Sequence, residues 1–276
     1  MAVGKAVRRY EPWTGERTRM GTRLRFFISR GFIEALRSRW ALFILFVTYG
    51  LLIVPRLFEA LATSDPFDPQ LYGPLLTDVH LFVLILAAVA GSSLFASDIQ
   101  DRTIVLYRVR RMGAPYYLVG RLASLAAVLG AVSVAPIAIL SSVAILSAAP
   151  SLSLVVDQGR IVLFALGLGC GVAVFFALFA GAISVLLRER RYAAPAIVFA
   201  VLFSEIASSI LSALSTSSLA SLVSVWGNFS LVGAYLFGTD LSAGPAPWQA
   251  AGALSAVALA CAALMVRELV YREDLP

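Results

Sequence analysis

The chain has 276 residues, of which 60% are hydrophobic and only 14% are charged, and its mean hydropathy is +0.87. Soluble domains carry roughly 25% charged residues, so this composition excludes an ordinary soluble enzyme or binding module and predicts an integral membrane protein. Arginines that face anionic lipid explain the net charge of +6, so the charge does not indicate a nucleic-acid-binding protein.

Six apolar runs are long enough to cross a bilayer, which requires about 20 apolar residues each. We therefore expect an all-α polytopic membrane protein with six transmembrane helices: a cytoplasmic N-terminal segment over 1–39, followed by one transmembrane domain over 40–276. The third and fourth runs exceed the minimum length, so they are expected to tilt or to bury one end in protein. The six runs are Trp40–Ala62, Thr77–Phe95, Leu118–Ala149, Ile161–Leu187, Ala194–Leu214 and Trp248–Val270.

The basic residues alternate between the connecting segments. All but Arg56 and Arg160 of the 22 Lys and Arg residues lie in four segments: 1–39, 96–121, 188–192 and the tail from 267 onward. The positive-inside rule therefore places both termini, the 96–121 insert and the 188–192 loop in the cytosol.

A charged insert over residues 97–115 separates the second and third runs. From Thr103 to Met112 its apolar residues recur at helical spacing, which predicts a short amphipathic helix lying flat on the membrane surface. Asp98, Asp101 and Thr103 are suited to cap the start of this helix. The apolar face holds Val105, Leu106, Val109 and Met112, and the opposite face holds Tyr107, Arg108, Arg110 and Arg111.

A second amphipathic helix is predicted from Thr22 to Arg39, ahead of the first run. It is expected to lie in the head-group layer and to lead into the first span, with Trp40 at the boundary. A further possibility is that its arginines also contact a cytosolic partner. One face holds Leu24, Phe27, Ile28, Phe32 and Ala35, and the other holds Arg23, Arg30, Glu34 and Arg37.

Glu205 is the one carboxylate well inside an apolar run, eleven residues after Ala194. At 1.5 Å per residue it lies about 16 Å from the inner end of that run, near the middle of the bilayer. Ser208, Ser209 and Ser212 continue a polar stripe from it. An ionisable group at this depth normally faces a bundle interior or a wet cavity. These four residues are therefore candidates to line a translocation path, and a hydrogen-bonded structural glutamic acid is the other interpretation.

Residues 215–247 contain no basic residue and include an apolar stretch interrupted by glycines. Because a further crossing would place the C-terminus outside, short re-entrant helices fit this segment better. Cys170, Cys261 and the single histidine, His80, are too few for a metal cluster, so we expect no metal site. The chain also contains no G-x-x-x-x-G-K-[ST] motif for nucleotide binding.

This organisation resembles the permease subunits of type-2 ABC transporters, most of which are exporters. Those subunits have six spans with both termini inside, an N-terminal interfacial helix, a coupling helix between the second and third spans, and short outer helices between the fifth and sixth. Arg102 and Arg110 depart from the family pattern, which usually has Gly and Pro near these positions. The matching positions are Asp98, Thr103, Ile104–Leu106, the Gly120-Arg121 pair and the string Glu34–Trp40.

The resemblance implies a multi-pass protein of the cell membrane, in a prokaryotic inner membrane, that is not itself an enzyme. ATP and Mg would bind a separate nucleotide-binding ATPase subunit, so no cofactor is expected on this chain. Two permease chains, identical or different, would enclose a path lined by the first, second and fifth spans. The residues expected to dock the ATPase are Asp98, Asp101, Arg102, Thr103, Tyr107, Arg108, Arg110 and Arg111.

The main alternative is an ion-coupled secondary transporter or channel that binds a proton or cation at Glu205. One buried carboxylate is few for ion coupling, and the sequence shows no inverted repeat. The runs also lack the paired carboxylates or Ser/His arrangement of an intramembrane enzyme. A membrane scaffold without transport activity stays open on the sequence alone.

Overall fold

The computed structural model describes residues 20–62, 69–101, 114–147, 152–214, 218–238 and 245–271. Every element in these ranges is helical. Six segments are long and apolar enough to span a membrane: Arg39–Glu59, Thr77–Gln100, Pro115–Ser133, Gly159–Leu187, Arg190–Leu214 and Pro247–Leu269. The predicted helical class and six helices of spanning length are therefore confirmed, and the fold is compatible with a multi-pass membrane protein.

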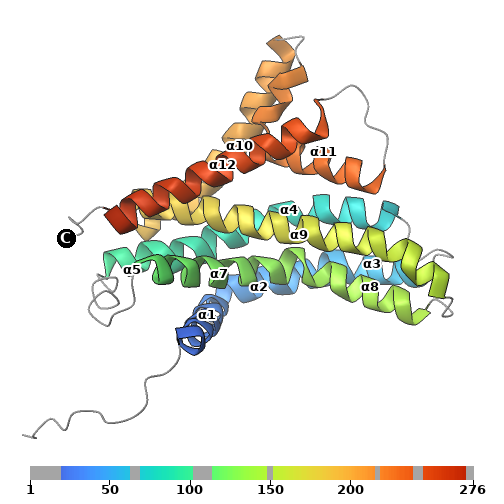
Figure 1. Ribbon diagram of the computed structural model, residues 1–276, viewed down its shortest axis with the longest axis horizontal. Coiled ribbons are helices and arrows are strands. Elements are labelled where there is room, and N and C mark those ends of the chain that lie inside the picture. Colours follow the sequence, from blue (N-terminus) through green and yellow to red (C-terminus); the bar gives the residue numbers. More distant parts are fainter. Residues whose placement is uncertain are drawn as a thin grey trace, which may run out of the picture.

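Several spans combine more than one element (Figure 1). The fourth and fifth are single helices, α9 (Leu152–Leu187) and α10 (Arg190–Leu214). The first comprises α2 (Arg39–Thr48), the π-helical turn η1 (Tyr49–Ile53) and α3 (Val54–Ala62); the second comprises α4 (Pro69–Gly91), the π-helical turn η2 (Ser92–Ala96) and α5 (Ser97–Gln100); the third is α7 (Ala114–Ser133), continued by α8 (Ala135–Ser147); and the sixth is α12 (Pro247–Val266) with the π-helical turn η4 (Arg267–Tyr271).

The centre of the bundle consists of α4, α7 and α9, which pack against one another. Their facing side chains are mostly Leu, Val, Ala and Phe, and many are fully buried. By contrast, α2, α10 and α12 are buried over only a small part of their length. Figure 1 shows α10 and α12 diverging from the three central helices.

The two longest apolar runs exceed a single span for different reasons. The third run is divided at Val134, between α7 and α8, because Pro136 lacks the amide that would continue the helical ladder. The fourth run belongs to α9, whose 36 residues extend about 54 Å at 1.5 Å per residue. A hydrocarbon core is only about 30 Å thick, so α9 extends well beyond one crossing.

The predicted N-terminal helix is present as α1 (Met20–Leu36), which ends three residues before the predicted boundary. It packs against α7 and lies across the bundle rather than along it (Figure 1). Phe27 and Ala35 are buried on the predicted apolar face, whereas Arg30 and Glu34 are exposed on the other.

Between the fifth and sixth spans lie a 3-10 helix, η3 (Ser218–Val223), and α11 (Val225–Phe237). With 13 residues, α11 is too short to cross a bilayer. It packs against α12, α9 and α4, and ends at Gly238, whose φ of 69° is the left-handed conformation that glycine adopts easily.

One end of the bundle collects α1, α5, the start of α7, the turn between α9 and α10, and the end of α12 (Figure 1). We call it the basic end, because ten of the twelve described arginines lie there; Arg56 and Arg160 are the other two. This arrangement matches the alternation of charge that the sequence shows.

Candidate functional site

A buried ion pair lies at the basic end, between the second and third spans. The Arg121 guanidinium donates through Nε to Asp98 Oδ2 at 2.8 Å and through Nη2 to Asp98 Oδ1 at 2.9 Å. Tyr117 Oη donates to Asp98 Oδ2 at 2.6 Å, and Arg121 Nη1 donates to Glu34 Oε2 at 3.1 Å. We call these four residues the ion network. It connects α1, α5 and α7.

The members of the ion network differ strongly in exposure. The side chains of Arg121 and Asp98 are 4% and 8% exposed, whereas that of Glu34 is 53% exposed. A buried guanidinium requires a partner, and the bidentate geometry to Asp98 is the strong form of such a bond. The link to Glu34 is screened by solvent and contributes little.

Local sequence explains how these groups meet. Tyr117 and Arg121 are four residues apart on α7, so they lie one above the other on one helical face. Asp98 is at the end of the second span, just after η2, where the chain starts toward the insert. The network therefore fixes the first residues of the insert to the first turns of the third span.

The same face of α7 allows α1 to approach closely. A Cβ on Gly120 would overlap the ring of Phe27, and one on Gly31 would lie 2.5 Å from Ser124 Oγ. Ser124 Oγ donates to the carbonyl oxygen of Ile28 at 3.1 Å. Side chains larger than hydrogen at these two glycines would separate the helices.

A cavity of about 560 Å³ lies between α1 and α5, beside the ion network. Its charged residues are mixed in sign, and two apolar side chains on α1, Phe26 and Ile33, are more than half exposed beside them. The lining residues are Phe26, Ser29, Arg30, Ile33, Glu34, Arg37, Ser97, Asp98, Asp101 and Arg121.

The predicted docking residues divide into two groups. Asp98 is buried in the ion network, so its carboxylate positions other groups of this chain, whereas Asp101 is exposed at the cavity between α1 and α5. The other predicted docking residues, Arg102, Thr103, Tyr107, Arg108, Arg110 and Arg111, lie outside the described residues.

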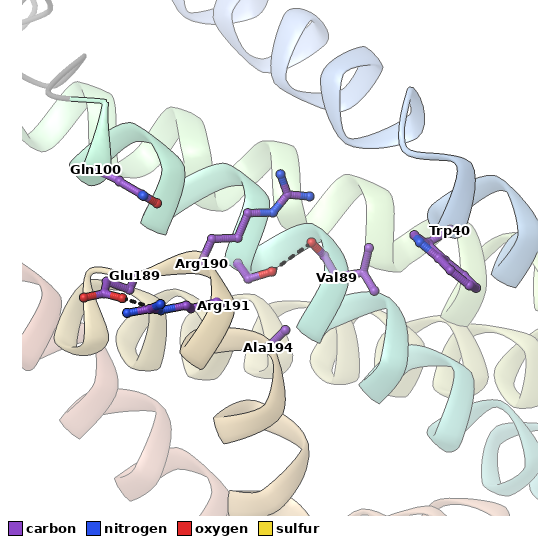
Figure 2. A pocket seen from close by; sticks show the side chains of 8 residues that line it. Trp40, Val89, Gln100, Glu189, Arg190, Arg191 and Ala194 are labelled. Atoms are coloured by element: carbon purple, nitrogen blue, oxygen red, sulfur yellow. Dashed lines mark hydrogen bonds and ion pairs between the residues drawn. The ribbon is translucent and has the colours of Figure 1, made fainter.

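A second cavity, of about 810 Å³, opens between the first, second and fifth spans at the basic end. Figure 2 shows the Arg190 side chain extending from α10 toward the helix that carries Val89 and Ser92. Arg191 is instead paired with Glu189 at 2.8 Å. The lining residues are Trp40, Val89, Ser92, Gln100, Glu189, Arg190, Arg191 and Ala194. We call this space the three-span cavity.

Glu205, the predicted path residue, holds the start of α11. Its Oε1 accepts the backbone amide of Trp226 at 3.0 Å, and its Oε2 accepts the hydroxyl of Ser224 at 2.6 Å. Ser224 Oγ in turn accepts the amide of Gly227 at 2.6 Å, as a helix N-cap does. Both oxygens of the carboxylate therefore have partners on the short helix.

The serines near Glu205 also have backbone partners. Ser208 Oγ donates to the carbonyl oxygen of Ala220 at 3.3 Å, on η3, and Ser209 Oγ donates to that of Glu205 at 2.9 Å. Ser212 Oγ donates to that of Ser208 at 2.5 Å. A role of these four residues in a translocation path stays a prediction, while their hydrogen bonds stabilise α10 and its contact with η3.

An aromatic cluster holds α11 against the central helices. The His80 ring stacks on Trp226 with ring centroids 4.4 Å apart, and Trp226 also stacks on Phe176 at 4.8 Å. Phe229 packs edge-on against Phe175 at 5.3 Å. His80 is thus a buried packing residue between α4 and α11.

Over the described ranges, no group of three or more His, Cys, Asp or Glu side chains could hold a metal ion. Neither a scan against protein-family models nor a search of curated proteins finds a match for this chain.

Sequence reasoning missed the partnership of Asp98 with Tyr117 and Arg121, and also the place of Arg190 in the three-span cavity. A signal existed for the first: Arg121 falls four residues after Tyr117, within an apolar helix where a lone arginine demands a partner. For Arg190 no signal existed, because a loop arginine is typical of any inner loop.

Proposed function

We propose that this chain is the transmembrane permease subunit of an ATP-driven ABC transporter of the export type. It would form the translocation path and take its energy from a separate ATPase subunit docked at the 98–112 segment. The observation that carries the proposal is the ion network, which joins α1, the start of that segment and the start of the third span.

The ion network suits transmission of a mechanical movement. A displacement of the insert would move Asp98, which lies at its start. Because Asp98 pairs directly with Arg121, α7 would be displaced with it. The close contact of Phe27 with Gly120 extends the connection to α1. Because packed elements and buried ion pairs move together as units, a shift of the insert would move all three elements.

The cavity beside the ion network provides the complementary docking surface. It combines arginines and carboxylates with two exposed apolar side chains on α1, Phe26 and Ile33. This combination is typical of a polar protein interface with a few apolar anchors. It supports the hypothesis that α1 also contacts the ATPase, beyond its role as an interfacial anchor.

Other features support a translocation path and a second permease chain. The three-span cavity lies between the first, second and fifth spans, the same three that the resemblance assigns to the path. The helices α2 and α10 expose large apolar side chains, including Phe46 and Phe203, which a second permease chain could cover. At the opposite end, α11 and η3 fit short helices that enter and leave one leaflet.

The test is purification of the tagged full chain from its native host in mild detergent, with mass spectrometry of the proteins that accompany it. Arg108, Arg110 and Arg111 are changed together to Glu, and Arg160→Glu at the opposite end serves as the control. We expect a nucleotide-binding subunit and its ATPase activity with the wild type and the control, and neither with the triple variant.

An ATPase-free preparation that still moves an ion into liposomes would overturn the proposal. It would favour the ion-coupled transporter, for which Glu205 is the candidate binding group. The hydrogen bonds of Glu205 to Trp226 and Ser224 do not favour this second function, because they leave the carboxylate engaged in holding α11.

A further inference from the structure

Among the described residues that line the three-span cavity, Arg190 is the one cation without an ionic partner. Arg191 is paired with Glu189, so these two charges offset each other. For Arg190, the part of the chain that the structure describes supplies neither a hydrogen bond nor an ion pair to its guanidinium. The described charges that line the cavity therefore sum to one positive charge, which Arg190 carries, and its side chain extends from α10 toward the helix of Val89 (Figure 2).

The polar residues of the cavity are suited to an anionic group. A guanidinium forms two parallel hydrogen bonds to phosphate or carboxylate, which makes arginine the preferred residue for these anions. Gln100, on the opposite wall, is exposed and has an amide that can donate to the same group. Ser92, in η2, also lines the cavity, and its Oγ donates to the carbonyl oxygen of Val89 at 3.2 Å. π-Helical turns within α-helices often occur at functional sites.

The remaining walls are suited to a hydrocarbon chain. Val89 and Ala194 line the cavity, and Trp40 borders it with its side chain 69% exposed. The flanking helices α2 and α10 continue as exposed apolar surface, with Phe43 58% and Phe199 68% exposed. An acyl chain can therefore leave the cavity along these helices without crossing a polar wall.

The position of the cavity along the spans matches a lipid head group. Trp40, Gln100 and Arg190 each lie at or next to the end of a candidate span in the structure, and tryptophan and arginine are enriched where a bilayer meets water. The volume of about 810 Å³ lies within the range of small-molecule sites.

We propose that the three-span cavity binds an anionic amphiphile, a lipid-like molecule with a phosphate or carboxylate head group. Arg190 and Gln100 bind the head group, and Trp40, Val89 and Ala194 contact the start of the chain. The interpretation of this molecule as the transported substrate rests on the permease function proposed above, whereas its binding does not.

The experiment uses the full chain, with any subunits that accompany it, in phosphatidylcholine nanodiscs containing a minor fraction of phosphatidylglycerol. Native mass spectrometry counts the lipids retained on the protein, and titration gives an apparent Kd for each lipid. Glycerol phosphate and inorganic phosphate are added in separate competition series, because they carry the anionic group without the chain.

We expect the wild type to prefer phosphatidylglycerol over phosphatidylcholine. Arg190→Gln should weaken phosphatidylglycerol binding about tenfold, the effect of losing one charge-assisted interaction. Glu189→Gln should strengthen it about twofold, because it removes a carboxylate that repels the head group. Arg160→Gln, the matched control at the opposite end, should leave the Kd unchanged.

Arg190→Gln and Glu189→Gln are expected to change phosphatidylglycerol affinity in opposite directions. A general loss of structure would instead lower the affinity in both variants. Ala194→Leu fills part of the space beside the apolar wall of the cavity. It should weaken phosphatidylglycerol binding while leaving Arg190 in place. Equal binding of both lipids by the wild type, or an unchanged Kd in Arg190→Gln, would overturn the proposal. Competition by glycerol phosphate at the lipid's own concentration would overturn the choice of an amphiphile.

The outcome is separable from that of the permease proposal. If the chain shows the lipid preference but has no ATPase partner, the lipid-site proposal stands and the permease proposal fails. If the chain has an ATPase partner but no lipid preference, the permease proposal stands and the lipid-site proposal fails.

Discussion

Substitution of Asp98 by Asn tests the ion network at its most buried point. Asparagine has nearly the same volume, so no cavity forms, but the Arg121 guanidinium loses its buried counter-charge. The Arg121 side chain is 4% exposed, and its other anionic partner, Glu34, is 53% exposed and screened. Removing one partner of a buried ion pair costs about 3–5 kcal/mol. Since domains are typically stable by only about 5–15 kcal/mol, this is a large fraction of the total.

The assay is reversible unfolding in mixed micelles of a neutral detergent and dodecyl sulfate, which gives a free energy of unfolding for each variant. Glu34→Gln is the control, with an expected loss below about 1 kcal/mol because the group is exposed. Arg121→Met alone should resemble D98N, and the D98N/R121M double variant should lose less than the sum of the two single variants.

Two results would refute the reasoning. One is a D98N variant that is as stable as E34Q, which would mean that the buried pair is already compensated by water. The other is additivity of D98N and R121M, which would mean that the two side chains do not interact.

Two further predictions concern the packing of other helices. Glu205→Gln should lower the free energy of unfolding by about 1–3 kcal/mol, because the new amide has one accepting oxygen where the carboxylate used two, for Trp226 and Ser224. The same unfolding assay measures this loss. Unchanged stability with complete loss of transport would instead make Glu205 a path residue. Gly120→Ala should lower it by about 1–3 kcal/mol, because the new methyl group overlaps the ring of Phe27. Gly130→Ala on the same helix, where the nearest atom is 3.8 Å away, should be neutral or slightly stabilising, and equal effects at the two glycines would contradict the close packing of α1.

The six spans could be predicted from the sequence because hydrophobic length is a property of each segment alone. All the predicted runs except the third begin or end within a few residues of the observed helices, and the sixth agrees to one residue at each end. The third run was predicted as one long segment, and the structure divides it at Val134. Pro136 was visible in the sequence, but a proline in a membrane helix either kinks it or is accommodated, and the choice depends on neighbouring helices.

The partnerships within the candidate sites could not be predicted, because they join residues far apart in the chain. Asp98 and Arg121 were both recognised as family positions, yet their contact depends on the path of residues 99–120. Glu205 was recognised as a costly buried carboxylate, and its two possible roles differ only in what it faces. What Glu205 faces depends on the position of α11, and an amphipathic pattern does not encode the depth of a short helix.

The central claim is that an ATPase subunit docks at the basic end, next to the ion network. The most direct measurement is photo-crosslinking in the native host from an amino acid placed at Asp101, which is exposed beside the cavity between α1 and α5. Gly159 is exposed near the far end of α9 and provides the control position. The account predicts a cross-link at 101 to a protein that carries a nucleotide-binding motif, and none from 159. Absence of such a protein at 101, or its capture from 159 alone, would contradict the account.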